Sequence, residues 1–357
     1  MAEEREVLLR VENLCQYFKL DANTVNKAVD NVSFDIRKGE VFGLVGESGC
    51  GKTTTGRSII RLYDITSGSV YFKGKRICAG TKSYKDAIEA ARKEKRGCKD
   101  LARSAELDEI IAKNKEEIKS AVYDHKHADR KLVNEIQMIF QDPIASLDPR
   151  MTVRDIIAEG LVIKGVKDKE YIDQRVFEML ETVGLVREHA SRYPHEFSGG
   201  QRQRIGVARS LIMEPSLIIA DEPISALDVS IRAQIINLLN DLRHSLGITI
   251  LFIAHDLSVV KYFSDRIGVM YFGKMVELAD SDELFRHPFH PYTRSLLSAI
   301  PQPDPIYEKN RKRIVYNPVA DHDYRTSQPS FREVCPGHFV YCNDEEFERY
   351  QKEAEES

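Results

Sequence analysis

The chain has 357 residues, of which 42% are hydrophobic and 30% are charged, and its net charge at pH 7 is −4. This length suits one large α/β domain with an appendage, or two domains, and the small net charge gives no general attraction to nucleic acid. No apolar run approaches the roughly 18 residues that span a bilayer, and no signal peptide opens the sequence. The six cysteines are scattered and fit no disulfide framework. We therefore expect a soluble, intracellular protein with reduced thiols.

The elements expected at the N-terminal end are short strands around one helix. A turn at Lys38-Gly39 separates the second strand from the third, and Lys73-Gly74 closes the fourth. Apolar patterns between these turns predict strands over 7–14, 28–36, 40–45 and 68–72, and a helix over about 52–62.

The amino-acid composition of the chain changes between about residues 80 and 135. This stretch is dense in Lys, Arg, Glu and Asp, contains no proline, and has only sparse apolar positions such as Leu107 and Ile118. The pattern predicts a pair of charged helices with a break near Gly97.

Buried elements return after this insertion. The run 217–222, Leu-Ile-Ile-Ala-Asp-Glu, is an apolar strand ending in two acids, as expected for a strand buried on both faces. From about Pro301 proline and charge dominate, so we expect a loosely structured extension there. Regular packing signals return at 135–141, and the other predicted elements are a mostly helical region over 152–212, a helix over 231–246 and a strand over 248–254.

The run from Gly46 to Thr53, Gly-Glu-Ser-Gly-Cys-Gly-Lys-Thr, has the spacing of a phosphate-binding loop and follows an apolar strand. Its glycines allow a tight turn whose backbone N–H groups converge on a phosphate at a helix N-terminus. Lys52 then reaches the β- and γ-phosphates, and the Thr53 hydroxyl coordinates Mg²⁺. A glycine-rich turn with a chance lysine would not explain the flanking strand and helix. The predicted nucleotide ligands are Gly46, Ser48, Gly49, Cys50, Gly51, Lys52, Thr53 and Thr54.

Two acids close the buried strand downstream of this loop. Asp221 occupies the position at which phosphate-loop NTPases hold Mg²⁺. The adjacent Glu222 can polarise the water that attacks the γ-phosphate. A solvated acidic strand end is the alternative, which the upstream loop disfavours.

The turn Ser198-Gly199-Gly200-Gln201 is the most diagnostic motif. Together with the phosphate loop and the two acids, it resembles the signature of ABC-type ATPases. The resemblance implies that this serine and these glycines contact the γ-phosphate of an ATP molecule held by the opposing subunit. A Ser-Gly-Gly turn at a helix N-terminus is itself an anion cradle. A simple helix cap would explain the turn, but not its place ahead of a buried acidic strand.

The resemblance assigns further residues. Gln141 matches the glutamine that senses Mg²⁺ and the attacking water and couples to the membrane partner. His255 matches the switch histidine that contacts the γ-phosphate, and residues 225–228 match the loop that crosses the dimer interface. Tyr17, with Phe18 as second choice, matches the aromatic residue that stacks on adenine, although an ordinary strand aromatic stays open as an alternative.

Three further strings resemble the ATPases of oligopeptide and dipeptide importers. They lie at 141–152, 192–197 and 287–301, and the last, His-Pro-Phe-His-Pro-Tyr-Thr-Arg at its start, has no role in phosphate-loop chemistry. The resemblance implies an α/β fold, with a RecA-like phosphate-loop NTPase core, an antiparallel β subdomain and an α-helical signature subdomain. The expected domains are an ATPase domain over 1–300, with the charged helical insertion at about 80–135, and an importer-type C-terminal extension over 301–357.

The resemblance also implies cofactors and partners. ATP and Mg²⁺ are the expected cofactors. The expected partners are a second ABC ATPase, paralogous and forming a heterodimer, two transmembrane permease subunits and, indirectly, an extracytoplasmic peptide-binding protein. The chain would lie peripherally at the cytoplasmic face of the cell membrane, with no nucleic acid partner. The alternative is a soluble ABC ATPase of translation, DNA repair or regulation, whose charged insertion would contact nucleic acid. It predicts tandem cassettes or a long coiled coil, and a basic face.

Two features depart from this family. The charged insertion is longer than usual, and we expect a solvated helical hairpin without chemistry rather than a docking arm for a regulator or permease. Relatives often carry a cysteine cluster near the C-terminus that can hold an iron–sulfur centre, whereas only Cys335 and Cys342 occur here. Four thiolates are the usual requirement, so we expect no cluster in this chain alone. Zinc held by these cysteines with His322 and His338 stays open as an alternative.

Overall fold

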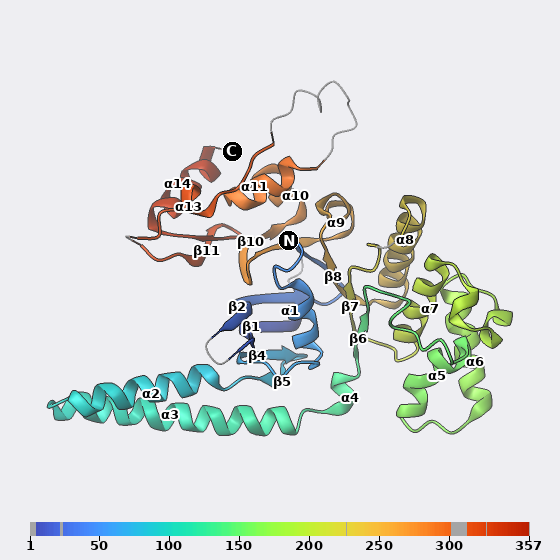
Figure 1. The fold of residues 1–357 in the computed structure, drawn as a ribbon, viewed down its shortest axis with the longest axis horizontal. Coiled ribbons are helices and arrows are strands. Elements are labelled where there is room, and N and C mark those ends of the chain that lie inside the picture. Colours follow the sequence, from blue (N-terminus) through green and yellow to red (C-terminus); the bar gives the residue numbers. More distant parts are fainter. Residues whose placement is uncertain (1–4, 22–23, 226, 301–312, 326, 357) are drawn as a thin grey trace. The chain divides into compact units, whose positions relative to one another are not determined.

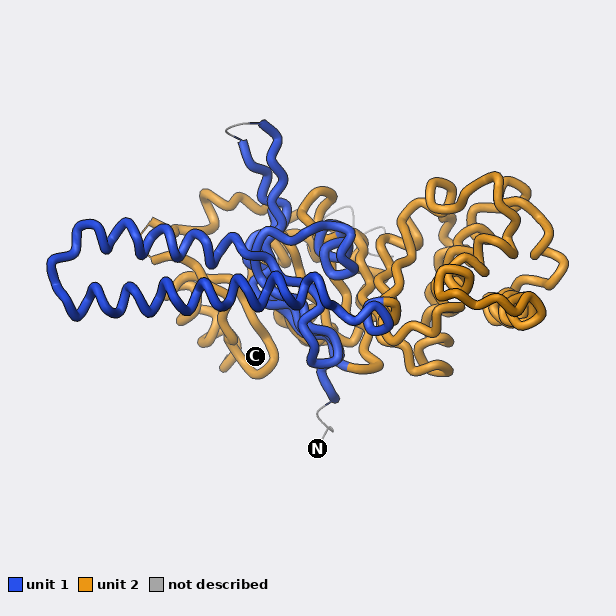
Figure 2. Tube along the Cα trace, turned by 90° about the horizontal axis from the view of Figure 1, so that it is seen from below, with its two compact units in different colours: residues 1–37, 53–133, 272–274 blue, residues 38–52, 134–271, 275–357 orange. Residues whose placement is uncertain are grey.

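The computed structural model of the protein describes residues 5–21, 24–225, 227–300, 313–325 and 327–356. Figure 1 labels its helices and strands. The chain divides into two compact units, which Figure 2 shows in different colours. Unit 1 holds residues 1–37, 53–133 and 272–274, and unit 2 holds residues 38–52, 134–271 and 275–357.

Unit 1 contains an antiparallel sheet of four strands in the order β2-β1-β4-β5. Apolar side chains of β1, among them Leu9, Val11 and Leu14, are buried and form part of its core. The predicted strands are present, and β1 and β2 extend further than their apolar patterns. The elements are β1 (Val7–Lys19), β2 (Val25–Arg37), α1 (Lys52–Ile59), β4 (Ser67–Phe72), β5 (Lys75–Ala79), α2 (Lys82–Gly97), α3 (Leu101–Lys126) and α4 (Arg130–Val133).

The charged insertion forms the predicted pair of helices, which Figure 2 shows as two long coils side by side. Helix α2 ends at Gly97, and Asp100 begins α3 by accepting a hydrogen bond from the Ala102 N–H (2.9 Å). The two helices pack on each other, and α3 also contacts β5. Their buried residues are Ile88, Ala91, Leu107 and Ala121. The hairpin is therefore held by a narrow apolar seam.

Unit 2 is built on an eight-stranded sheet in the order β11-β12-β10-β9-β3-β8-β7-β6. The five strands from β9 to β6 include the parallel pairs β9–β3, β3–β8, β8–β7 and β7–β6. Strands β7 and β8 are buried along their whole length, as their apolar sequences predict. Helices α5, α6 and α7 pack on one another, and α7 also contacts β6 and α8.

The strands of unit 2 are β3 (Val41–Val45), β6 (Ile136–Ile139), β7 (Leu217–Asp221), β8 (Thr249–Ala254), β9 (Arg266–Tyr271), β10 (Lys274–Asp280), β11 (Ser330–Cys335) and β12 (His338–Cys342). Its helices are α5 (Val153–Ile163), α6 (Lys169–Thr182), α7 (Gly199–Leu211), α8 (Val229–Leu246), α9 (Leu257–Phe263), α10 (Ser281–Arg286), α11 (Pro291–Ser298), α13 (Pro318–Asp321) and α14 (Asp344–Glu356), with short 3₁₀ turns at Arg187–Ser191 and Pro194–Glu196.

The parallel strands bring the predicted motifs to one edge of the sheet. Val45 at the end of β3 is in register with Ala254 at the end of β8, and Asp221 at the end of β7 is in register with Ile253. Open α/β sheets bind ligands at the carboxyl ends of their strands. The segments that leave this edge carry residues 46–52, Gln141, Glu222 and His255.

The expectation of a loosely structured C-terminal segment is wrong for residues 330–356. Strands β11 and β12 pair antiparallel, β12 joins the main sheet beside β10, and α14 packs on β11. These elements enclose a second apolar cluster of Phe289, Val334, Val340, Cys342 and Tyr350. The apolar positions are spread over separate elements among charged residues, so no local period reveals them. Residues 301–312 of the expected extension lie outside the described residues, and the domain boundary at 300 stays a prediction.

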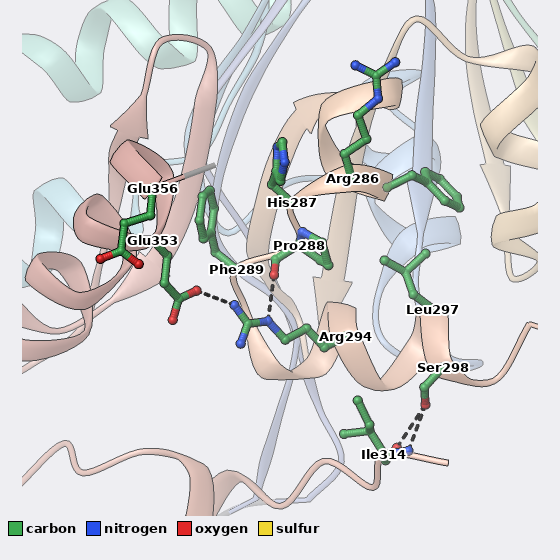
Figure 3. A pocket seen from close by; sticks show the side chains of 11 residues that line it. Arg286, His287, Pro288, Phe289, Arg294, Leu297, Ser298, Ile314, Glu353 and Glu356 are labelled. Atoms are coloured by element: carbon green, nitrogen blue, oxygen red, sulfur yellow. Dashed lines mark hydrogen bonds and ion pairs between the residues drawn. The ribbon is translucent and has the colours of Figure 1, made fainter. Parts of the chain in front are cut away.

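Helix α14 is also tied to α11 by charge. The Arg294 guanidinium donates to the Pro288 carbonyl oxygen (2.7 Å) and to Glu353 (2.6 Å), as Figure 3 shows. These residues line a pocket of about 730 Å³, with His287 on its wall. The C-terminal elements are thus packed and ion-paired with unit 2 rather than loosely attached.

The four residues considered for zinc do not form one cluster. The Cys342 sulfur is buried 3.6 Å from the Val340 carbonyl oxygen, and His322 Nδ1 lies 2.6 Å from a Glu346 carboxylate oxygen. Among the described residues, only Cys335 and His338 of the four join one group of possible metal ligands. Across the same described residues, no helix is long and apolar enough to cross a membrane.

Candidate nucleotide-binding site

The predicted phosphate loop connects β3 to α1 and is a tight turn. Gly46, Gly49 and Gly51 have φ values of 147°, 81° and 109°, which a residue with a side chain rarely adopts. At Gly46 a Cβ atom would also lie 2.2 Å from the Met270 carbonyl oxygen. The loop therefore requires glycine where the motif has it.

Lys52 turns back onto the loop that precedes it. Lys52 is only 4% exposed, and its ammonium donates to the carbonyl oxygens of Gly46 (2.7 Å) and Glu47 (2.9 Å). The Cys50 sulfur lies 3.7 Å from the same nitrogen, and burial raises the pKa of this thiol in spite of the ammonium. The loop thus holds one buried positive charge beside a neutral thiol.

Three side chains predicted as catalytic meet at one carboxylate oxygen. Gln141 Nε2 donates to Glu222 Oε2 (3.1 Å), and His255 Nδ1 lies 3.2 Å from the same oxygen. The Glu222 backbone has φ of 46°, and its N–H donates to the Ile253 carbonyl (2.9 Å). A non-glycine residue in this left-handed region is uncommon, and such residues cluster at functional sites. Neighbouring Asp221, the last residue of β7, is fully buried.

The turn at 198–201 is a complete helix cap. The Ser198 hydroxyl oxygen accepts from the Gln201 N–H (3.4 Å), and Gln201 Oε1 accepts from the Ser198 N–H (3.1 Å). A Cβ atom at Gly200 would lie 2.6 Å from a methyl group of Ile231, which explains the glycine. The simple helix cap that was the alternative explanation of this turn is therefore present, and contact of the turn with an ATP phosphate stays a prediction.

Two family models match the chain. The model described as "ABC transporter" matches residues 29–126 and 104–225, and the model described as "Oligopeptide/dipeptide transporter, C-terminal region" matches residues 276–339.

Curated relatives match over nearly the whole length. Oligopeptide transport ATP-binding protein OppF of Bacillus subtilis (strain 168) is 56% identical over 346 residues, which cover 97% of this chain and 99% of the relative. Dipeptide transport ATP-binding protein DppF of Lactococcus lactis subsp. cremoris (strain MG1363) is 48% identical, with 99% of each chain covered. The chain belongs to the ABC family of oligopeptide and dipeptide transport ATP-binding proteins.

Solved ABC cassettes share the fold of this ABC protein. The dimeric structure of a post-hydrolysis state of the ATP-binding cassette MJ0796, bound to ADP and Pi, matches with a TM-score of 0.57 and 26% identity, and the match covers 77% of this chain and 99% of that one. The predicted α/β phosphate-loop fold and the assignment to an ATP-binding family of ATPases are thereby confirmed.

The aromatic residue predicted to stack on adenine lies in unit 1. The Tyr17 hydroxyl donates to Asp30, and burial together with this carboxylate raises the pKa of Tyr17. The ammonium nitrogens of Lys27 and Lys82 lie 5.3 and 5.2 Å from the centre of its ring. The neighbouring Phe18 packs edge to face on another aromatic ring. Adenine stacking on Tyr17 stays a prediction.

Other predicted residues of this ABC protein fall on helix ends. Thr53 and Thr54 lie in the first turn of α1, in unit 1, and their contacts with nucleotide stay predictions. In the predicted interface loop, the Ser225 hydroxyl donates to the backbone carbonyl that follows β7 (3.1 Å), and Asp228 is the N-cap residue of α8. Ala226 of that loop lies outside the described residues.

The motifs did not reveal one residue that contacts the phosphate loop. The Tyr292 hydroxyl in α11 accepts a hydrogen bond from the Glu47 N–H (3.0 Å), and the residue is 2% exposed. His290 in turn caps α11, because its Nδ1 accepts from the Tyr292 N–H (3.1 Å). Both belong to the His-Pro-Tyr string that had no role in phosphate chemistry. The absence of a phosphate role could have suggested a structural role for the string, but a separation of 245 positions between Glu47 and Tyr292 left no local pattern that predicts the contact.

Proposed function

We propose that this chain is the ATP-hydrolysing, energy-coupling subunit of a membrane importer for oligopeptides or dipeptides. The observation that carries the hydrolytic role is the convergence of Gln141 and His255 on one oxygen of Glu222. The names of the relatives and the match of residues 276–339 to the C-terminal region of peptide transporters support the transport role.

In this proposal each ATP molecule lies between two subunits. The loop at 46–53 of one subunit binds the phosphates, Tyr17 stacks on the adenine, and the turn at 198–201 of the other subunit contacts the γ-phosphate. The capped helix N-terminus at Ser198 supports the last assignment. Closure of the two subunits moves permeases docked near Gln141, and hydrolysis resets the pair.

Glu222 is the proposed general base. Its carboxylate accepts a hydrogen bond from Gln141 and lies beside His255, so its orientation is fixed before a water molecule arrives. Lys52 and the backbone N–H groups of the loop stabilise the charge that develops on the transferring phosphoryl group. When ATP binds, phosphate oxygens must replace the two carbonyl oxygens that the Lys52 ammonium contacts in this structure.

The donor set around this site fits Mg²⁺, which prefers oxygen ligands. Asp221 offers a fully buried carboxylate at the end of β7. The Thr53 hydroxyl and the Gln141 amide oxygen are the other ligands that the family motifs assign. When bound, Mg²⁺ would neutralise negative charge on the phosphate oxygens.

The proposed partners are two transmembrane permease subunits, a second ABC ATPase of paralogous sequence and, indirectly, an extracytoplasmic peptide-binding protein. The chain would then be peripheral, at the cytoplasmic face of the membrane. The relatives' description as transport ATP-binding proteins supports permease partners in general.

The decisive experiment on catalysis is Glu222→Gln. We expect ATP to bind with unchanged affinity, whereas hydrolysis slows about 10²- to 10⁴-fold, the usual contribution of a general base. Glu170→Gln, on the exposed side of α6, makes the same chemical change away from the site and should hydrolyse normally. Rapid hydrolysis by Glu222→Gln would refute the assignment.

A second experiment tests the transport role. The tagged chain is purified from its native membranes, and the co-purifying proteins and RNA are identified. Two permeases and a second ATPase are expected, whereas stoichiometric RNA without permeases would favour the alternative of a soluble ABC ATPase.

A further inference from the structure

A compact group of possible metal ligands lies where α10 meets the turn between β11 and β12. Glu283 of α10, Cys335 at the end of β11 and His338 at the start of β12 each place one ligand atom within 4.8 Å of the other two. None of these residues has a role in the proposed nucleotide site. The group combines a carboxylate, a thiol and an imidazole, and this combination indicates a metal site more specifically than a cluster of acidic residues does.

The hydrogen bonds of His338 fix one side of its ring. The residue is fully buried, and its Nε2 lies 2.8 Å from a Glu277 carboxylate oxygen. Glu277 is also fully buried and accepts from the N–H groups of Phe289 (2.7 Å) and His290 (3.2 Å). A carboxylate held this way is an acceptor only, so Nε2 of His338 carries the proton. In the neutral ring the other nitrogen, Nδ1, then presents a lone pair.

That lone pair faces the ligand group and has no hydrogen-bond donor among the described residues. The Glu283 oxygen Oε1 lies 3.6 Å from Nδ1, and the Glu283 side chain is partly exposed. Two acceptors that face each other repel unless a proton or a cation lies between them. Two ligands about 2.1 Å from a tetrahedral zinc ion lie about 3.4 Å apart, close to the separation seen here.

We propose that Glu283, Cys335 and His338 bind one divalent metal ion of the zinc class. Nitrogen, sulfur and carboxylate oxygen are the ligand types of tetrahedral zinc, and a water molecule would complete the set. Glu277 then orients the imidazole of His338, because its carboxylate accepts a hydrogen bond from the ring nitrogen that does not bind the metal.

The surroundings allow an ion to enter and be retained. The Glu283 side chain is 36% exposed, and His287 Nδ1 lies 3.2 Å from its Oε1 and holds it in place. A thiol gives up its proton when it binds a metal ion, so binding should become tighter as pH rises. The bound ion would fasten the β11–β12 turn to α10.

The experiment uses the full chain, stripped of metal by a chelator and titrated with Co²⁺ as a spectroscopic substitute for Zn²⁺. We expect one equivalent to bind, with the visible absorption of a tetrahedral site and a sulfur-to-cobalt charge-transfer band. Cys335→Ser should lose that band and weaken binding at least about 10-fold. Cys98→Ser, which removes a thiol from the α2–α3 hairpin, is the matched control and should bind as the unaltered chain does.

A variant that fails to fold would be recognised by circular dichroism. Glu283→Gln, at a partly exposed position, then serves as the second test and should also weaken Co²⁺ binding about 10-fold or more. The proposal is overturned if the unaltered chain binds no Co²⁺ equivalent, or if Cys335→Ser and Glu283→Gln both keep the tetrahedral spectrum.

Discussion

Single residues of the His-Pro-Tyr string connect the C-terminal region to the phosphate loop. Glu277 in β10 accepts from the His290 N–H, His290 caps α11, and Tyr292 in the first turn of α11 accepts from the Glu47 N–H. Each contact satisfies a polar group that is buried or partly buried. The string therefore positions the base of the loop without contacting phosphate itself.

Tyr292→Phe should loosen the loop. It removes the acceptor of the Glu47 N–H, and a partly buried hydrogen bond of this kind contributes about 0.5–1.5 kcal/mol. We expect a lower free energy of unfolding in urea and weaker ATP binding by fluorescence titration. Tyr262→Phe, at a residue that is 87% exposed, should change neither quantity. Unchanged ATP affinity in Tyr292→Phe would show that the contact does not position the loop.

His290 should make stability depend on pH. Burial, with smaller effects of His322 and Arg294, lowers the pKa of His290 from 6.5 to about 3. Below pH 6.5 the unfolded chain therefore binds a proton that the folded chain does not, and stability falls as pH falls through this window. The loss is about 1.4 kcal/mol per pH unit, or about 2 kcal/mol between pH 7.5 and pH 5.

His290→Asn isolates this contribution, because asparagine is a good N-cap and does not titrate. Urea unfolding at pH 7.5 and pH 5 should show a stability loss smaller by about 2 kcal/mol in the variant than in the unaltered chain. Equal losses in the two proteins would contradict the assignment.

Among the elements, the α2–α3 hairpin is held mainly by local contacts. Its ion pairs include Lys95 with Asp108 and Arg103 with Glu94, all at exposed positions, and such pairs contribute little to stability. Nearer the sheet, Arg76 of β5 donates to Asp124 (2.8 Å). The outer part of the hairpin therefore depends on the rest of unit 1 much less than the inner part does.

Replacing residues 92–113 by a short Gly-Ser linker should leave nucleotide binding and the unfolding transition of the remaining chain nearly unchanged. The deletion keeps the Arg76–Asp124 contact and the inner turns of both helices. Calorimetry and ATP titration measure the two quantities. Loss of either would refute the view of a solvated hairpin, and loss of permease assembly alone would identify a docking arm.

The difference between local contacts and tertiary contacts also explains which elements could be predicted from the sequence. The buried strands β7 and β8 and the charged helix pair have signals within their own residues, and they were found. Strands β11 and β12 were missed because β12, the partner of β11, joins the sheet beside β10, which lies about 60 residues earlier in the chain. Their burial depends on tertiary pairing, which no local period records.

For the molecule as a whole, the predicted site residues that came together are those at the carboxyl edge of the parallel sheet. Gln141, Glu222 and His255 belong to three motifs distant in sequence, and the order β8-β7-β6 makes their strands neighbours. Residues whose roles depend on contacts between distant strings, such as Tyr292, could not be predicted. Family motifs predict which residues belong to the site, whereas the order of the strands in the sheet determines which of these residues lie close together.

The proposed function makes one claim that belongs to the pair of subunits rather than to one chain. If the loop at 46–53 and the turn at 198–201 of one chain contact two different ATP molecules, a mutation in the loop and a mutation in the turn should each empty a different site. In the pair that this chain forms with its proposed paralogous partner, both sites should retain ATP when the general base of each subunit is replaced by glutamine. Lys52→Ala in one subunit should empty one site and Ser198→Arg the other, so each variant alone halves the retained ATP. Both changes in the same subunit should remove all of it. If the loop and the turn of one chain served the same ATP molecule, the double variant would instead retain as much ATP as either single variant.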